Sequence, residues 1–88
     1  MKTEFKSSFG RDLKALKDRK LLDRIRAVIE EVEAAQSWQQ LAQLTKLQGK
    51  GDYYRIRVGD YRLGVIVENQ TMIFVRCLHR REVYKYFP

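Results

Sequence analysis

Residues 54–63 read Tyr-Arg-Ile-Arg-Val-Gly-Asp-Tyr-Arg-Leu, and this stretch decides the fold. Apolar residues alternate with arginine up to Val58 and resume at Tyr61, which is the period of a half-buried β-strand. Gly59 and Asp60 form a two-residue turn with glycine first, as a type II′ hairpin requires. The stretch therefore predicts an antiparallel hairpin in which Val58 faces Tyr61 and one side is apolar while the other is basic.

The short turn also fixes the partners on the basic side. Arg57 is expected opposite Arg62, and Arg55 is expected opposite Gly64. Two guanidinium groups side by side repel each other, so the pairing suggests that an anion is meant to lie there. Gly64 leaves room beside them because it has no side chain.

A third strand is expected from about Thr71 to Leu78, which completes an antiparallel meander. A three-residue loop at 69–71 would place Arg76 on the basic face and Cys77 in the core, whereas a two-residue loop would reverse them. We favour the three-residue loop because it buries the thiol and leaves the guanidinium exposed.

The chain before the hairpin is expected to begin with a strand at Lys2 to Lys6 and then to become helical. Ser7 or Ser8 offers an N-cap for a first helix. The second helix has an apolar stripe at helical spacing, made of Leu21, Leu22, Ile25, Val28, Ile29, Val32 and Ala35. Together the two helices predict a helical hairpin.

A short third helix is predicted from Ser37-Trp38-Gln39-Gln40, which has the spacing of a capping box. This helix would carry Trp38, Leu41 and Leu44 toward the core. An N-terminal strand, helices and then an antiparallel meander make an α+β fold. Eighty-eight residues without a Pro/Gly/Ser linker predict one domain over 1–88.

Composition limits the classes of function. The chain has one cysteine and one histidine, so we expect no Cys/His metal cluster and no internal disulfide. Apolar runs are too short to span a membrane, and the first residues lack the apolar stretch of a secretory signal. We therefore expect a cytoplasmic protein without a cofactor or a membrane partner.

The net charge of +7 suggests a polyanionic partner, such as nucleic acid, an anionic membrane or an acidic protein. Residues 1–44 hold nine basic and seven acidic residues, whereas residues 45–88 hold nine basic and four acidic ones. Six of the nine basic residues in the second half are arginine, whose planar fork of donors suits phosphate. The C-terminal half is therefore the expected phosphate-binding half.

The segment His79-Arg80-Arg81-Glu82-Val83-Tyr84 adds an imidazole, two guanidinium groups and a phenol. Such a set is suited to RNA cleavage, because cationic groups hold the scissile phosphate while a proton carrier activates the 2′-hydroxyl. His79 is the candidate general acid or base. Tyr84 could stack on a base or assist proton transfer. The candidate catalytic residues are Arg57, Arg62, His79, Arg80 and Tyr84.

Each of these features also has a purely structural interpretation. A basic strand face is more often a solvated or phosphate-binding surface than an active site, and a lone histidine is more often structural. The candidate RNA-binding residues are Lys46, Lys50, Arg55, Arg76 and Arg81. Of these, the two lysines could contact RNA or merely increase solubility.

Three segments carry a resemblance to a known family: Lys46-Leu47-Gln48-Gly49, the stretch from Tyr54 to Leu63, and His79 to Tyr84. In this order they resemble the RelE/ParE superfamily of toxins from bacterial and archaeal toxin-antitoxin pairs. The chain looks closer to the RelE branch, including its ending from Tyr84 to Pro88.

This resemblance implies a microbial-RNase-like fold and a metal-independent endoribonuclease, or mRNA interferase, that cleaves mRNA in the ribosomal A site and stops translation. The family's active-site positions fall here on Arg55, Arg57, Arg62, His79, Arg80 and Tyr84. The best-known members have lysine where this chain has Arg55 and Arg57, and one such lysine is a candidate base. In this chain, His79 is the first candidate for that role.

The resemblance also implies an acidic, RelB-like cognate antitoxin, besides the ribosome and mRNA as partners. A chain of charge +7 suits an acidic binder, because complementary charge speeds the encounter. Two alternatives stay open: a ParE-like inhibitor of DNA gyrase, and a non-catalytic RNA-binding module.

Overall fold

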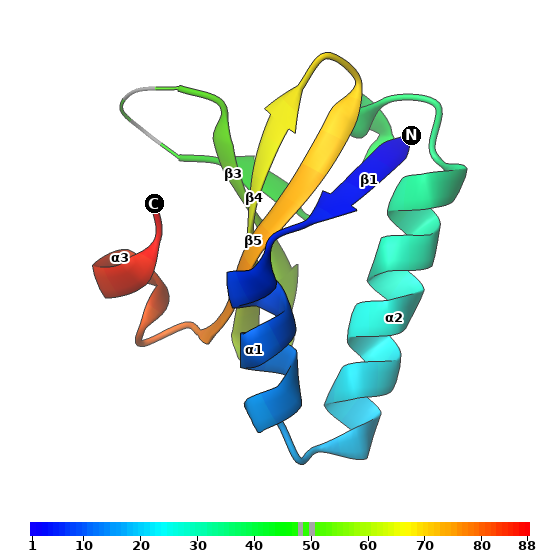
Figure 1. Cartoon of the computed structure of the whole chain (residues 1–88). Coiled ribbons are helices and arrows are strands. Elements are labelled where there is room, and N and C mark those ends of the chain that lie inside the picture. Colours follow the sequence, from blue (N-terminus) through cyan, green and yellow to red (C-terminus); the bar gives the residue numbers. More distant parts are fainter. Residues whose placement is uncertain (48, 50) are drawn as a thin grey trace.

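The computed structural model describes residues 1–47, 49 and 51–88, and it shows an α+β fold with one five-stranded sheet (Figure 1). The elements follow in the order β1 (Lys2–Phe5), α1 (Ser7–Ala15), α2 (Arg19–Ala34), the 3-10 helix η1 (Trp38–Gln40), β2 (Leu44–Lys46), β3 (Tyr53–Val58), β4 (Tyr61–Glu68), β5 (Thr71–His79) and α3 (Val83–Tyr86). The predicted fold class, helical hairpin and meander are confirmed.

The sheet has the strand order β1-β5-β4-β3-β2. Strands β3, β4 and β5 form the predicted antiparallel meander, and β1 joins β5 in parallel. The edge strand β2 pairs with β3, where sequence reasoning expected the end of a third helix. That prediction was wrong beyond the single turn of η1, because Leu44 pairs with Ile56 in the sheet.

Helices α1 and α2 pack on one face of the sheet and form the main core with it (Figure 1). The stripe of α2 supplies Leu21, Ile25 and Val32 to this core, as its spacing predicted. Asp18 caps α2 by accepting a hydrogen bond from the Leu21 N–H, at 3.1 Å. The opposite face carries α3 and a smaller cluster formed by Leu78, Val83 and Phe87.

The turn between β4 and β5 corrects one prediction and explains another. Thr71 pairs with Glu68, so the loop has two residues, Asn69 and Gln70, both with positive φ. The three-residue loop was therefore wrong. A β-bulge between Gly64 and Val65 then shifts the register by one residue, which returns Cys77 to the core opposite Leu63. The buried thiol is confirmed for this different reason.

The first helix holds this bulge in place. Gly64 pairs with Arg76 and Val65 pairs with Phe74, so Val75 is the extra residue. The Ser8 hydroxyl donates a hydrogen bond to the Val75 carbonyl at 2.6 Å. Ser8 is thus a link between α1 and β5, and the prediction that Ser7 or Ser8 caps α1 was wrong, since Lys6 is at the N-cap.

Candidate active site

A basic cleft lies on the face of the sheet that α1 and α2 leave uncovered. Its lining residues come from β2, β3, β4 and α3: Thr45, Arg55, Arg57, Arg62 and Tyr84. An adjoining hollow shares three of these residues and adds Lys46, Leu47, Phe87 and Pro88. Of the described residues that line the two hollows, none is acidic. The cleft therefore has an uncompensated positive charge.

Arg57 and Arg62 are direct partners across β3 and β4, as the hairpin register predicted. Arg62 is anchored, because its Nη1 donates hydrogen bonds to the carbonyls of Gly59 and Tyr61, each at 2.9 Å. Burial lowers the pKa of the Arg62 guanidinium, and the charges of Arg57, Arg55 and Arg80 lower it further. The arginines therefore repel one another, and a bound anion would relieve that repulsion.

Tyr84 lies over Arg55 at the side of this pair. The guanidinium carbon of Arg55 is 4.7 Å from the centre of the Tyr84 ring, within the range of a cation–π contact. Arg55 lowers the pKa of the Tyr84 phenol, first by hydrogen bonding and then by its charge, and Arg62 adds to the effect. The ring is 78% exposed, so a ligand in the cleft can reach it.

The remaining basic candidates lie around this centre. The Arg80 N–H donates to the Asp60 carbonyl at 2.8 Å, and its Nε is 3.9 Å from Asp60 Oδ1. Arg81 is exposed at the turn before α3, and Lys46 lines the adjoining hollow. The prediction for Lys50 lies outside the described residues. These positions are compatible with contacts to a nucleic-acid chain that extends beyond the cleft.

The structure does not bring His79 or Arg76 into the cleft. His79 pairs with Tyr61, and their rings meet edge to face with centres 5.4 Å apart on the side of the main core. The His79 Nδ1 accepts a hydrogen bond from the Arg81 N–H at 3.2 Å. Arg76 has the expected register but forms an ion pair with Asp12 of α1, with Nε 2.8 Å from Oδ2.

Sequence reasoning missed two parts of the site. Thr45 lies opposite Arg55 because β2 is a strand, and three residues are too few for an alternating pattern to reveal it. Phe87 and Pro88 reach the site because the C-terminal segment folds back over the sheet. The glycine at position 64 was the available signal, since its missing side chain is the space that Phe87 fills.

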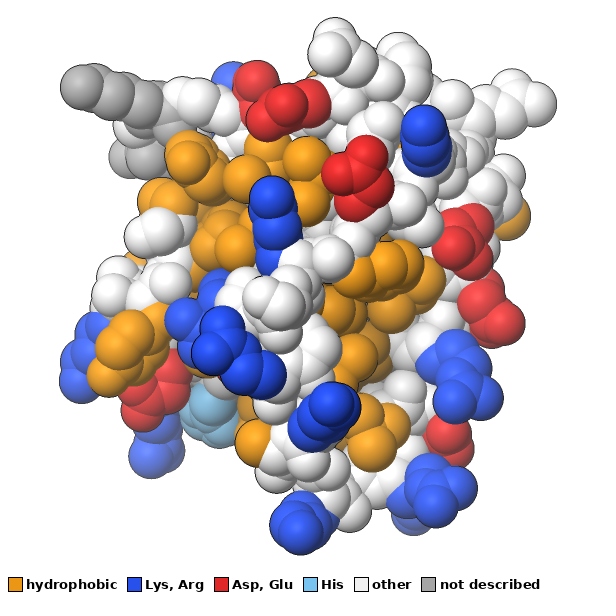
Figure 2. All heavy atoms as spheres, viewed as in Figure 1, with side chains coloured by type: hydrophobic (Ala, Val, Ile, Leu, Met, Phe, Trp, Pro, Cys, Tyr) orange, Lys and Arg blue, Asp and Glu red, His pale blue; other side chains and the backbone are white. Residues whose placement is uncertain are grey.

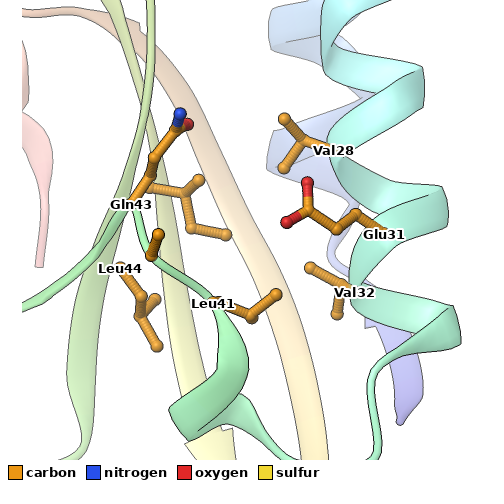
Figure 3. Close-up of a pocket in the computed structure, with 8 residues that line it drawn as sticks. Val28, Glu31, Val32, Leu41, Gln43 and Leu44 are labelled. Carbon is orange, nitrogen blue, oxygen red and sulfur yellow. The ribbon is translucent and has the colours of Figure 1, made fainter.

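A second hollow has a different character. It lies between α2 and the segment that leads into β2, where Val28, Glu31 and Val32 face Leu41, Gln43 and Leu44 (Figure 3). Its volume of about 50 Å³ is small beside the 190 Å³ of the basic cleft, and arginine is absent from its described lining. Figure 2 shows basic side chains over the lower part of one face, whereas most acidic ones there lie toward the top and over α2. The basic cleft is the stronger candidate for a polyanion site.

Comparison with known proteins identifies the family of this chain. Residues 3–84 match the family described as ParE toxin of type II toxin-antitoxin system, parDE. The chain belongs to this toxin family. It is also 43% identical to Toxin RelE3 of Methanocaldococcus jannaschii over 89 residues, which covers 100% of both chains. The resemblance to the RelE branch is confirmed, and this family member is a toxin of a type II toxin-antitoxin system.

Solved structures give the same result for the fold. The toxin is similar to a chain of the RelB-RelE antitoxin-toxin complex from Methanococcus jannaschii, with a TM-score of 0.82 and 40% identity over 97% of this chain and 99% of that one. It shares its fold with a chain of the archaeal RelE-RelB complex from Pyrococcus horikoshii OT3, with a TM-score of 0.72 and 22% identity over 90% and 93% of the two chains. In the part of the toxin that the structure describes, none of the helices is both long and apolar enough to cross a membrane.

Proposed function

We propose that this toxin is a metal-independent endoribonuclease that cleaves messenger RNA in the ribosomal A site. The observation that carries the proposal is the pairing of Arg57 with Arg62 in a cleft that Arg55 and Tyr84 complete. Three guanidinium groups around one hollow match the charge of a phosphodiester and its neighbours. Full-length identity of 43% to a RelE toxin supports the same activity.

The chemistry follows from the charges. The 2′-oxygen of a ribose attacks the adjacent phosphorus as its proton leaves, and the bond from phosphorus to the 5′-oxygen breaks as that oxygen gains a proton. Negative charge increases on the non-bridging oxygens during this step, and Arg57 and Arg62 are placed to stabilise it. Arginine stays protonated in proteins, so these side chains act electrostatically and the protons need another carrier.

Tyr84 is the better placed of the two proposed proton carriers. It lines the cleft, and a lowered phenol pKa makes the phenolate available at a lower pH than in a free tyrosine. The catalytic role of His79 stays a prediction, because the imidazole ring packs on Tyr61 away from the cleft. Tyr84 can also stack on a base of the bound RNA, since most of its ring is exposed.

We also propose that an acidic, RelB-like antitoxin binds this toxin. Two of the similar solved chains come from complexes that contain RelB. The net charge of +7 favours an acidic partner, and the cleft is lined by three arginines and by no acidic residue among those described.

The activity is tested with purified ribosomes that carry a defined mRNA, followed by mapping of the mRNA ends. We expect cleavage in the A site by the wild-type toxin and about 10²- to 10³-fold slower cleavage by Arg62→Ala, because a donor to the developing charge is lost. Tyr84→Phe keeps the ring and loses the phenol, so it separates proton transfer from stacking. The matched control for loss of one positive charge is Arg26→Ala, at an exposed position of α2.

Three results would contradict parts of this proposal. If Arg62→Ala cleaves as fast as the wild type, the cleft is not the active site. Impaired cleavage by His79→Ala but not by Tyr84→Phe would move the proton carrier to the histidine. Toxicity with intact mRNA and with DNA damage would select gyrase inhibition, which the ParE family match keeps as the second candidate.

A further inference from the structure

Three paired positions across the meander form a row beneath the C-terminal segment. Arg55 of β3 pairs with Gly64 of β4, and Gly64 pairs with Arg76 of β5. Paired positions of neighbouring strands lie on the same side of a sheet. The row therefore presents two guanidinium groups with an empty place between them, on the side that carries α3.

Phe87 fills the empty place. A Cβ atom added to Gly64 would lie 2.6 to 2.7 Å from three carbons of the Phe87 ring, which is closer than real Cβ atoms approach. The ring is 5% exposed, and it meets the Tyr53 ring edge to face with centres 5.7 Å apart. Gly64 is thus required for the ring to lie directly on the backbone of β4.

The two arginines hold the tyrosines of α3 on either side of Phe87. Arg55 lies 4.7 Å from the centre of the Tyr84 ring, and Arg76 lies 6.0 Å from the centre of the Tyr86 ring. Helix α3 has only four residues, too few to be stable without tertiary contacts. Its place on the sheet consequently depends on this row and on buried Val83.

Arg76 is in turn fixed by the first helix. Asp12 Oδ2 accepts a hydrogen bond from Arg76 Nε at 2.8 Å, and Oδ1 accepts one from Nη2 at 3.2 Å. The same carboxylate accepts a hydrogen bond from the Cys77 N–H at 2.8 Å, next to the bulge. Asp12 therefore joins α1 to β5 and sets the direction of the Arg76 side chain toward α3.

We propose that Gly64, Arg76 and Asp12 are positioning residues that hold the C-terminal segment so that Tyr84 stays over the basic cleft. The proposal rests on the proposed function, because Tyr84 is the side chain being positioned for RNA cleavage. It assigns Arg76 to the support of the site instead of to RNA binding. None of the three residues needs to touch the RNA.

Gly64→Ala is the sharpest test, because one added methyl group displaces the Phe87 ring while the sheet backbone is unchanged. The matched control is Gly10→Ala in α1, where an added Cβ would meet nothing within 4 Å. The position of Tyr84 is measured through its phenol pKa, by NMR titration of ¹³C-labelled tyrosine assigned with Tyr84→Phe. This pKa reports on the distance to Arg55 of β3 and Arg62 of β4, whatever the protein does to RNA.

We expect the Tyr84 pKa to rise toward its ordinary value in Gly64→Ala and to stay lowered in Gly10→Ala. Cleavage of mRNA on ribosomes should fall about 10- to 100-fold in Gly64→Ala, because a displaced catalytic group loses its alignment. Asp12→Asn should shift both quantities in the same direction but less, since Arg76 loses its charged partner while Tyr53 and Gly64 still hold Phe87. The charge-matched control for Asp12→Asn is Asp23→Asn, at an exposed position of α2.

The outcomes separate the two proposals. An unchanged Tyr84 pKa and unchanged cleavage in both Gly64→Ala and Asp12→Asn would overturn the positioning role. If Gly64→Ala does not fold, the Tyr84 pKa and the cleavage rate of Asp12→Asn decide whether the positioning role holds. If the wild type does not cleave mRNA, the proposed function fails, whereas a Tyr84 pKa that still responds to both variants would uphold the positioning role.

Discussion

The two faces of the meander use the same strands for opposite purposes. On the side of α1 and α2, alternate residues of β3, β4 and β5 are apolar and buried, and they meet the helices in a continuous core. On the other side, the intervening residues include Arg55, Arg57 and Arg62, and a segment of only four helical residues covers part of the surface. The core face can therefore provide the stability that the repulsion on the site face reduces.

The largest expected effect comes from the core face. Phe74 is fully buried and contacts the rings of Phe5 and Phe9, so Phe74→Ala should lower the free energy of unfolding by about 3–5 kcal/mol. Its neighbour Ile73 lies on the other face and is half-buried. Both variants are measured by urea titration, and Ile73→Ala should lower the free energy of unfolding clearly less than Phe74→Ala. Equal losses of unfolding free energy in the two variants would contradict the distinction between the two faces.

Cys77 gives the core face a measurable pH dependence. Burial, and after it the charge of Asp12, raises the pKa of its thiol from the ordinary 9.0 to about 12. The folded state therefore keeps the proton after the unfolded state loses it, and stability should fall as the pH rises from about 9 toward 12. At pH 10 this fall is on the order of 1 kcal/mol.

The measurement compares wild type with Cys77→Ala in urea at pH 8 and pH 10, because tyrosines and lysines titrate in both proteins. The difference in unfolding free energy between the two proteins should shrink at the higher pH. A constant difference would mean that the thiol ionises equally in the folded and unfolded states.

The smallest expected effect comes from the site face and has the opposite sign. Arg57→Gln removes one member of a facing pair of like charges, so it should raise the free energy of unfolding by about 0.2–1 kcal/mol. Cleavage of mRNA should fall in the same variant. Arg26→Gln on α2 should change neither quantity appreciably. A loss of stability in Arg57→Gln would show that the pair is not repulsive.

The sequence contained most of the meander and four of the five residues that line the basic cleft. The Gly59-Asp60 turn and the alternation around it sufficed to pair Arg57 with Arg62, because a two-residue turn leaves one register. The cleft accordingly contains Arg55, Arg57, Arg62 and Tyr84, all named from the sequence. The roles of these side chains in cleavage stay predictions.

What the sequence could not give depends on tertiary contacts. The bulge at Val75 arises in the pairing of β4 with β5 and is completed by Ser8 from a distant helix. The position of His79 could have been inferred, because the alternation that buries Cys77 turns His79 to the same side. The partner of Arg76 could not, since Asp12 lies 64 positions away and nothing in their local patterns connects them.

The bulge has a consequence for how this chain tolerates changes of length. The two-residue turn at Asn69 and Gln70 and the extra residue at Val75 compensate each other, and together they place every later side chain of β5 on its proper side. Deletion of Val75 would close the ladder with Phe74 still beside Val65 and Arg76 still beside Gly64, whereas a straightened strand that kept Val75 would exchange the environments of Arg76 and Cys77. A deletion of one residue in this part of the chain should consequently be tolerated best at the bulge, where the ladder closes without turning any later side chain of β5 to the other face.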